Sequence, residues 1–200
     1  VIGVGAVIAL MSIGRGAEAQ VTASLESVGT NLLFVRPGQA VSGSPGLTLE
    51  DAFALETASA DVLRVAPEVS SFLQVVAAGA NAFAQVLGTT PDIQDMRDLD
   101  VGSGSFLTDA DVRSRSSVVV LGSDVSEGLF GGLDPVGGSV RIGGRPFSVI
   151  GVLKSKGGTA LGSQDNIVIV PITTAQDRLF RERSVQGGDQ VQLIYVQTSD

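Results

Sequence analysis

The sequence predicts an α+β fold, on three observations. Short apolar runs typical of strands alternate with turn residues, and 26 of the 200 residues are glycine, so many tight turns are expected. Segments 47–60 and 173–183 have a helical instead of an alternating rhythm. The order strand, helix, strand, strand opens a βαβ-type unit that the last strand completes, with a strand-rich unit inserted between.

The chain opens on an apolar run, because residues 1–14 carry no charged side chain. As a helix this run would span about 21 Å, less than the roughly 30 Å of a bilayer core. Three interpretations stay open: a core helix, the end of a transmembrane helix, or a signal peptide. For the last, Ala-Glu-Ala at 17–19 resembles a cleavage site, but a positive n-region is absent. Beyond the run, an apolar stripe continues at helical spacing: Ala17, Val21, Leu25 and Val28.

The next elements predict the start of the globular fold. Segment 31–38 reads as a buried strand that ends at Pro-Gly, and 39–46 as a polar loop. A helix is expected over 47–60, with Thr48 as N-cap and Asp51 at the spacing of a capping box.

The middle of the chain is predicted to be rich in strands. Segment 62–92 contains two strands around a Gly/Asn turn, followed by a helical turn and loop at 91–99. Segment 116–132 contains a buried strand and a short helix capped by Ser123 or Asp124.

The clearest local signal is the hairpin predicted over 138–157, because Gly143-Gly144 separates two alternating runs. Val140 and Ile142 should share one face, continued on the second strand by Phe147 and Val149. The remaining elements are a flexible loop at 157–165, a strand at 166–171, a helix at 173–183 and a last strand at 190–198.

Composition argues against several functional classes. The net charge is −8 and the chain has no basic stripe, which disfavours nucleic acid as a partner. Without His or Cys, the chain lacks the usual general base, the commonest zinc ligand and thiolate chemistry. No Walker A pattern occurs, and no carboxylate spacing proposes a hydrolase pair. The acidic run Asp92, Asp95, Asp98 and Asp100 is irregular and is expected to be a solvated edge.

An ordered set of phrases carries a resemblance to a known family. The most specific are "GTNLLFVRPG" and "VGGSVRIGGRPFSVIGVL", and "LTLEDAFAL", "RVAPEV", "VLGTTPDI" and "VPITTAQDRLF" accompany them in order. The set resembles the periplasmic core domain of MacB-like ABC transporter permeases, of the FtsX/MacB type. The chain departs from this pattern at "VGSGSFLTDADV", where relatives often have a Gly-Arg-Phe-Phe phrase.

The resemblance implies a division of the chain. Residues 1–28 would be the end of a first transmembrane helix and a stalk helix that continues from it. Residues 29–95 with 188–200 would form a porter-like lobe, and 96–187 an inserted strand-rich lobe. The domain would lie on the extracytoplasmic side of a bacterial or archaeal cytoplasmic membrane.

The resemblance also implies partners. The permease would pair with a second permease copy and a cytoplasmic ABC ATPase that binds ATP and Mg²⁺, while this chain binds no cofactor and catalyses nothing. A periplasmic adaptor or another outer protein is a further candidate partner. Nucleic acid is not expected as a partner. ATP-driven closure of the dimer would be relayed to the extracytoplasmic domains and would there drive export outside the membrane. The alternative is a secreted or lipid-anchored binding module with no transport role.

The candidate functional residues form two sets, and neither is catalytic, cofactor-binding or metal-binding. The first set would carry the stalk and its coupling to the porter lobe: Arg15, Val21, Leu25, Val28, Gly29, Thr30 and Asn31. The second set lies in the loop 155–163 and would contact a partner: Ser155, Lys156, Gly157 and Gly158.

Overall fold

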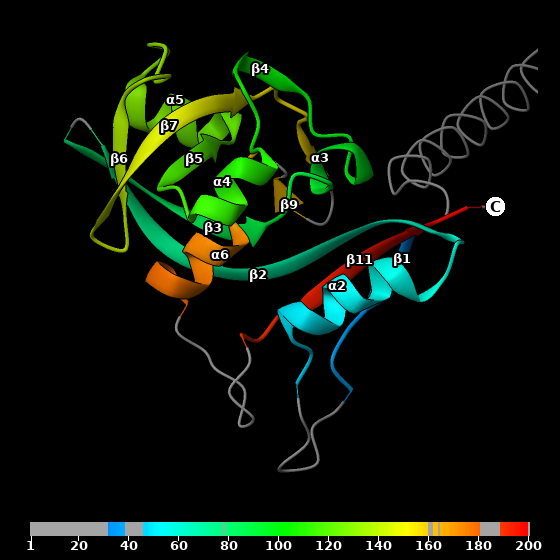
Figure 1. Ribbon diagram of the computed structural model, residues 1–200. Helices are drawn as coiled ribbons and strands as arrows, with labels where there is room; N and C mark the ends of the chain where they lie inside the picture. The colour runs from blue at the N-terminus through cyan, green and yellow to red at the C-terminus, as the bar shows by residue number, and fades with distance from the viewer. Residues whose placement is uncertain are drawn as a thin grey trace, which may run out of the picture.

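The computed structural model describes residues 32–38, 46–77, 79–159, 162–163, 165–180 and 189–199. Its strands are β1 (Leu32–Val35), β2 (Val62–Ala77), β3 (Ala80–Thr89), β4 (Val101–Gly104), β5 (Val118–Leu121), β6 (Ser139–Ile142), β7 (Arg145–Leu153), β8 (Gly158–Thr159), β9 (Gly162–Ser163), β10 (Ile167–Pro171) and β11 (Leu193–Thr198). Its helices are α2 (Leu49–Ala58), α3 (Ile93–Met96), α4 (Asp109–Ser114), α5 (Ser123–Phe130), α6 (Ile172–Thr174) and the π-helical turn η1 (Ala175–Leu179). The fold mixes helices and strands as the sequence predicts (Figure 1).

A small antiparallel sheet combines β1, β11 and the first half of β2. Helix α2 covers one face of this sheet (Figure 1), where Ala52 packs in one cluster with Val65 and Ile194. The predicted capping box is confirmed, because the Asp51 N–H donates to Thr48 Oγ1 at 3.2 Å and the Thr48 N–H donates to the Asp51 carboxylate at 2.8 Å.

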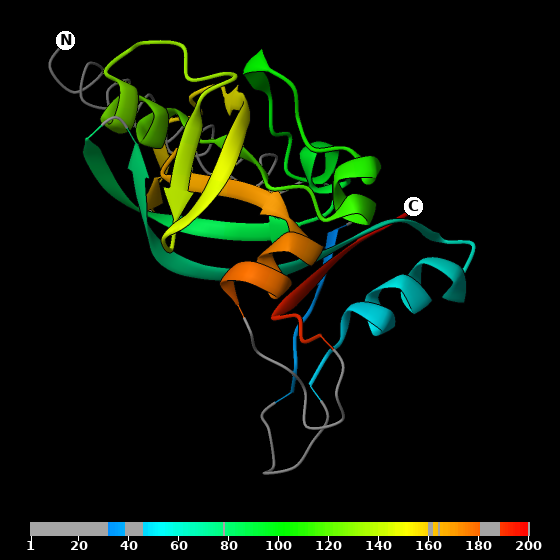
Figure 2. The ribbon, with the colours of Figure 1, turned by 60° about the vertical axis from the view of Figure 1, so that its left-hand side comes forward.

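The second half of β2 belongs to a closed barrel. Strands pair in the order β2, β3, β10, β5, β7 and β6, and β6 pairs back onto β2 through Val75↔Ile142 and Val76↔Arg141. Figure 2 shows these strands curving around a common interior. Alternating residues point inward and build the apolar core. They include Val75, Ala84, Val86, Val119, Leu121, Val140, Ile142, Phe147, Val149, Val168 and Val170.

A second apolar cluster lies on the outside of the barrel and joins it to the small sheet. Ile93 and Met96 of α3 share this cluster with Leu87 and Ile169 of the barrel and with Tyr195 of β11. The barrel and the small sheet are therefore connected both by the continuous strand β2 and by side-chain packing.

Several sequence expectations agree with the described elements. The β2–β3 hairpin and the helical turn α3 occur where they are predicted. Gly143 and Gly144 have φ values of 54° and 81°, as a two-residue hairpin turn requires. Val140, Ile142, Phe147 and Val149 are all buried in the barrel, as the alternation predicts.

Two expectations about local environment differ from the structure. Segment 31–38 is predicted to be a buried strand, yet Leu33 and Phe34 are 56% and 48% exposed. The reason is that β1 pairs only with β11 among the described strands and so lies at a sheet edge. The N-cap of α5 is Gly122, not Ser123 or Asp124. Gly122 stays extended because its N–H donates to the carbonyl of Ile167 at 2.8 Å.

The later part of the chain shows further differences. Residues 158–163, expected in a flexible loop, include the paired strands β8 and β9. The helix expected over 173–183 is described as α6 and η1, and η1 ends at Leu179 with Phe180 as its C-cap. Strand β4 and helix α4 are not anticipated by the sequence patterns; α4 begins with a capping box of Thr108 and Asp111.

The predicted lobe boundaries stay a prediction. Within the described residues, strand pairing changes partner inside β2, between Glu68, which pairs with β11, and Val69, which pairs with β3. No helix in the described ranges has both the length and the apolar composition needed to cross a membrane.

Candidate functional site

The structure describes one of the two predicted sets of functional residues. The stalk and coupling set, Arg15, Val21, Leu25, Val28, Gly29, Thr30 and Asn31, lies outside the described residues. The loop set, Ser155, Lys156, Gly157 and Gly158, follows the last strand residue of β7 and leads into β8. Most of this loop set meets at a single carboxylate.

That carboxylate is Asp165, which is 5% exposed and precedes β10. Its Oδ2 accepts hydrogen bonds from Ser155 Oγ at 2.6 Å and from the Gly157 N–H at 2.9 Å. Its Oδ1 accepts one from the Lys156 N–H at 2.8 Å. The backbone has to fold around the carboxylate to supply both amides, and Gly157 does so at φ 78°, a conformation that favours glycine.

Opposing effects act on the pKa of Asp165. Burial alone would raise the pKa, because it disfavours the charged form. The hydrogen bonds from Ser155, Lys156 and Gly157 favour the carboxylate and together lower the pKa below its ordinary value of 3.8. Asp165 is therefore ionised at neutral pH, and its bonds to the loop are charge-assisted.

Two lysines connect this loop to the segment that follows α3. Lys156 Nζ donates to the carbonyl of Arg97 at 3.1 Å and lies 3.2 Å from Asp98 Oδ2. Lys154 Nζ lies 3.2 Å from Asp100 Oδ2, and the Lys154 N–H donates to the Asp100 carbonyl at 2.8 Å. The segment that follows α3 and the loop that precedes β8 are thus joined by main-chain and side-chain contacts.

The acidic run expected at a solvated edge takes part in ion pairs. Asp98 and Asp100 pair with the two lysines, and Asp95 pairs with Arg64 of β2. The three carboxylates are more than half exposed, so each pair contributes little to stability. Among the described residues, no group of three or more side chains of the metal-binding types comes together.

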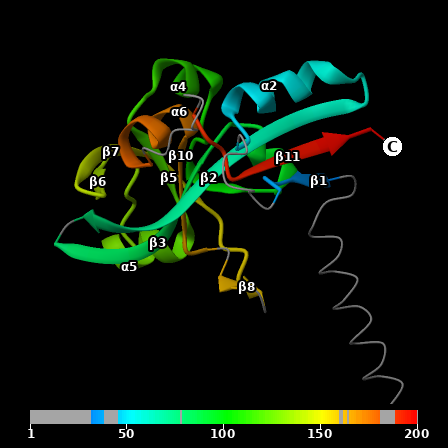
Figure 3. The same cartoon turned by 90° about the horizontal axis from the view of Figure 1, so that it is seen from below.

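The β8–β9 hairpin extends from this anchored base. Gly158 pairs with Ser163 and Thr159 with Gly162. Figure 3 shows β8 at the end of a segment that reaches away from the barrel strands. The hydrogen bonds of Asp165 and the ion pair of Lys156 hold the base of this hairpin in place.

A second feature, which sequence reasoning missed, lies where β2 changes partner. Glu68 is the last β2 residue in register with β11, opposite Leu193, and it is only 7% exposed. Tyr195 contacts its carboxyl group, while Arg97 and Arg36 act on it at longer range. Glu68 Oε2 has no hydrogen-bond partner within the described residues.

Burial dominates the ionisation of this junction. It raises the pKa of Glu68 above 4.5, although Arg97 and the hydrogen bond with Tyr195 pull it down. It also raises the pKa of Tyr195 to about 12, helped by the neighbouring charge of Glu68. The junction therefore holds a carboxyl group in an environment that disfavours its charge.

Comparison with known proteins identifies the family. The family model described as "MacB-like periplasmic core domain" matches residues 1–200. The chain belongs to the MacB-like periplasmic core domain family. A macrolide export ATP-binding/permease protein MacB from Hyphomonas neptunium is 41% identical over 187 residues, covering 90% of this chain and 29% of the relative. The protein of the same name from Rhodospirillum rubrum is 40% identical over 186 residues, covering 90% and 28%.

Solved structures of MacB-like domains share the fold. The periplasmic region of MacB from Actinobacillus actinomycetemcomitans superposes with a TM-score of 0.72 at 25% identity, covering 88% of this chain and 78% of that one. The extracellular domain of the transporter YknZ from Gram-positive bacteria gives a TM-score of 0.66 at 23% identity, covering 85% and 83%. A periplasmic core domain is the extracytoplasmic part of a membrane transporter, and this chain spans less than a third of the two MacB relatives.

Glu68 and Asp165 of this MacB-like domain were not predicted as site residues, and the sequence indicates their roles to different degrees. Glu68 stands out as a charged residue in the short apolar stretch from Val65 to Val69, and that misfit is a signal for a buried polar contact. Asp165 lies in a polar loop where an aspartate is ordinary, so only the tertiary structure reveals its role as an anchor.

Proposed function

We propose that this domain belongs to an ABC transporter permease and relays ATP-driven movement of the transporter to substrate export outside the membrane. The observation that carries the proposal is the course of β2, which runs without a loop from the small sheet into the barrel. At about 3.3 Å per residue, its 16 residues span roughly 50 Å.

The register of the small sheet supports a mechanical role. Leu32 at the start of β1 is paired with Gln197 near the end of β11, so the described chain enters and leaves at one end of this sheet. Val196 is in turn paired with Val65 of β2. A force applied at this end would act on β2 through adjacent hydrogen-bonded strands and would reach the barrel along a continuous backbone.

The partners follow from the family. We propose a second permease copy as the dimer partner and a cytoplasmic ABC ATPase, with ATP and Mg²⁺ bound by that ATPase and no catalysis by this domain. The anchored β8–β9 hairpin, through Ser155, Lys156, Gly157 and Gly158, is proposed as a contact for an outer partner such as a periplasmic adaptor. The relatives are named for macrolide export, so macrolides are the first cargo to assay.

Uncoupling the two parts of β2 tests the relay in the complete transporter. Two glycines inserted between Glu68 and Val69 keep the inward–outward alternation of β2, which has period two, but make the connection pliable. The matched control inserts two glycines between Gly143 and Gly144, in a hairpin turn that is not part of the path. We expect the β2 variant to retain ATP hydrolysis and lose export, while the control retains both. Export at the control's level, with equal amounts of folded protein, would refute the relay.

A further inference from the structure

The outer face of the barrel carries a stripe of aromatic and cationic side chains across β3, β2, β6 and β7. This outer stripe is defined by Phe83, Phe72, Val76, Arg141 and Pro146. Phe72 and Val76 alternate along one face of β2, and they are 56% and 37% exposed. Phe83, on β3, is 66% exposed and stacks on Phe72, with ring centroids 5.7 Å apart and an interplanar angle of 19°.

Strand pairing extends the stripe toward the cationic end. Val76 is paired with Arg141 of β6, and Arg141 with Pro146 of β7. Residues paired directly across antiparallel strands have their side chains on the same face. Arg141 is exposed and forms no ion pair with a described residue. Arg145 is paired with the inward-facing Ile142, so it belongs to the other face and is not part of the stripe.

The remaining positions on this face between the two aromatics and Arg141 carry no charge. Gln74 is paired with Phe83, Asn81 with Val76, and Gln85 with Phe72. The stripe crosses three interstrand steps of about 4.8 Å and four residues along β2, so its backbone footprint is roughly 14 by 13 Å. That is the size of the central anchor of a protein interface and not of a whole one.

The chemistry of the stripe indicates its occupant. Exposed stacked aromatics beside arginine form the composition that dominates binding energy in protein interfaces. The stripe bears only positive charge, on a chain whose net charge is −8. A carboxylate of a partner would pair with Arg141, and this charge complementarity favours an acidic contact segment.

We propose that the outer stripe is a docking surface for a partner protein whose contact segment combines a carboxylate with an apolar side chain. The apolar side chain would cover the Phe72–Phe83 stack, and the carboxylate would pair with Arg141. This surface is distinct from the β8–β9 hairpin, and the proposal does not depend on the relay through β2.

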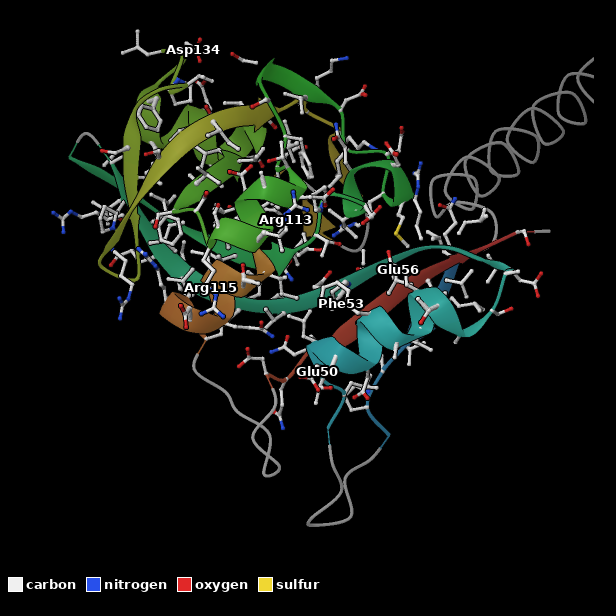
Figure 4. All side chains as sticks on the ribbon, in the orientation of Figure 1. Glu50, Phe53, Glu56, Arg113, Arg115 and Asp134 are labelled. Carbon is white, nitrogen blue, oxygen red and sulfur yellow. The ribbon has the colours of Figure 1, made fainter. Side chains whose placement is uncertain are left out.

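Photocrosslinking in the complete, membrane-embedded transporter tests the proposal. A benzoylphenylalanine replaces Phe83, and in the matched control it replaces Phe53, which is 44% exposed on α2 and lies away from the barrel (Figure 4). We expect an adduct with one other protein from position 83 and not from position 53, joined through a segment that contains Asp or Glu. The crosslinked segment is then synthesised as a labelled peptide, and its Kd for the purified transporter is measured.

Charge reversal decides between the possible occupants. The variant Arg141→Glu should weaken peptide binding at least about tenfold, and Phe72→Ser should do the same. Arg113→Glu, a reversal on α4 outside the stripe, should leave the Kd unchanged (Figure 4). The proposal is overturned by the absence of a position-specific adduct, by an adduct with a second transporter copy or with lipid, or by a Kd that Arg141→Glu does not change.

Discussion

Replacing Asp165 by Asn removes the charge at the base of the β8–β9 hairpin while keeping the shape of the side chain. The two carboxylate oxygens of Asp165 accept hydrogen bonds from Ser155 Oγ, the Lys156 N–H and the Gly157 N–H. Asparagine offers one carbonyl oxygen, which can serve Ser155 and Gly157 at the Oδ2 position. Its amide group would then face the Lys156 N–H, so that two donors oppose each other in a buried site.

The expected loss combines one charge-assisted hydrogen bond with an unsatisfied buried donor, and together these cost about 2–4 kcal/mol of unfolding free energy. For a domain of this size, that corresponds to a fall in Tm of roughly 5–15 °C. The contribution also depends on pH. Because the folded pKa of Asp165 lies below 3.8, its contribution is present above that value and is lost as pH falls through the folded pKa.

Denaturant unfolding at pH 7, followed by circular dichroism, measures the loss, and hydrogen exchange at the Lys156 and Gly157 amides locates it. The matched control is Asp134→Asn. Asp134 is exposed at the edge of the barrel (Figure 4), and its carboxylate also accepts a hydrogen bond from a main-chain group, the Val136 N–H at 3.1 Å. An asparagine oxygen can keep that bond, so a change of about 0.5 kcal/mol or less is expected. Equal free-energy changes in the two variants, or unaltered exchange at both amides, would refute the anchoring role of Asp165.

Four further substitutions test other parts of the fold. Glu68→Gln should raise the free energy of unfolding at pH 7, because burial lifts the folded pKa of Glu68 above 4.5 and so makes its charged form costly. In parallel unfolding titrations of both proteins, this gain should shrink as the pH falls toward 4.5. Gly122→Ala should lower stability by about 3 kcal/mol or more in thermal unfolding, since its Cβ would lie 2.2 Å from the Asp165 carbonyl oxygen. Gly128→Ala in the same helix meets nothing within 4 Å and should stabilise by about 0.5–1 kcal/mol, so a loss there would contradict the packing. Thr48→Ala should cost about 1 kcal/mol by removing the cap of α2, and an unchanged unfolding midpoint would show that the cap does not contribute.

The elements that could be predicted are those whose causes are local. The capping box of α2 depends on Thr48 and Asp51, and the β6–β7 turn on Gly143 and Gly144, so neighbouring residues suffice to define them. The exposure of Phe34 could not be predicted in the same way. A run of apolar residues looks alike in a central strand and in an edge strand, and only the pairing of β1 distinguishes the two.

The role of the loop 155–163 in contacting a partner stays a prediction, and its anchor could not be read from the sequence. Ser155, Lys156 and Gly157 were singled out from the glycine-rich loop, but their common partner Asp165 follows eight to ten residues later, beyond β9, and is brought back by the β8–β9 hairpin. Lys154 and Lys156 pair with acidic residues 54 and 58 positions earlier in the chain. No periodicity or spacing in a single sequence encodes such contacts.

The sequence by itself therefore determined the class of the fold, its turns and caps, and the family resemblance, because these depend on residue order and on interactions within a few positions. The tertiary structure decided how β2 joins a sheet to a barrel, where the loop before β8 is anchored, and which apolar residues stay exposed. Those outcomes depend on strands that pair across long stretches of chain, as when β6 closes the barrel on Val75 and Val76. Long-range pairing depends on how all the strands fit together, and that fit is a property of the whole chain and not of any segment.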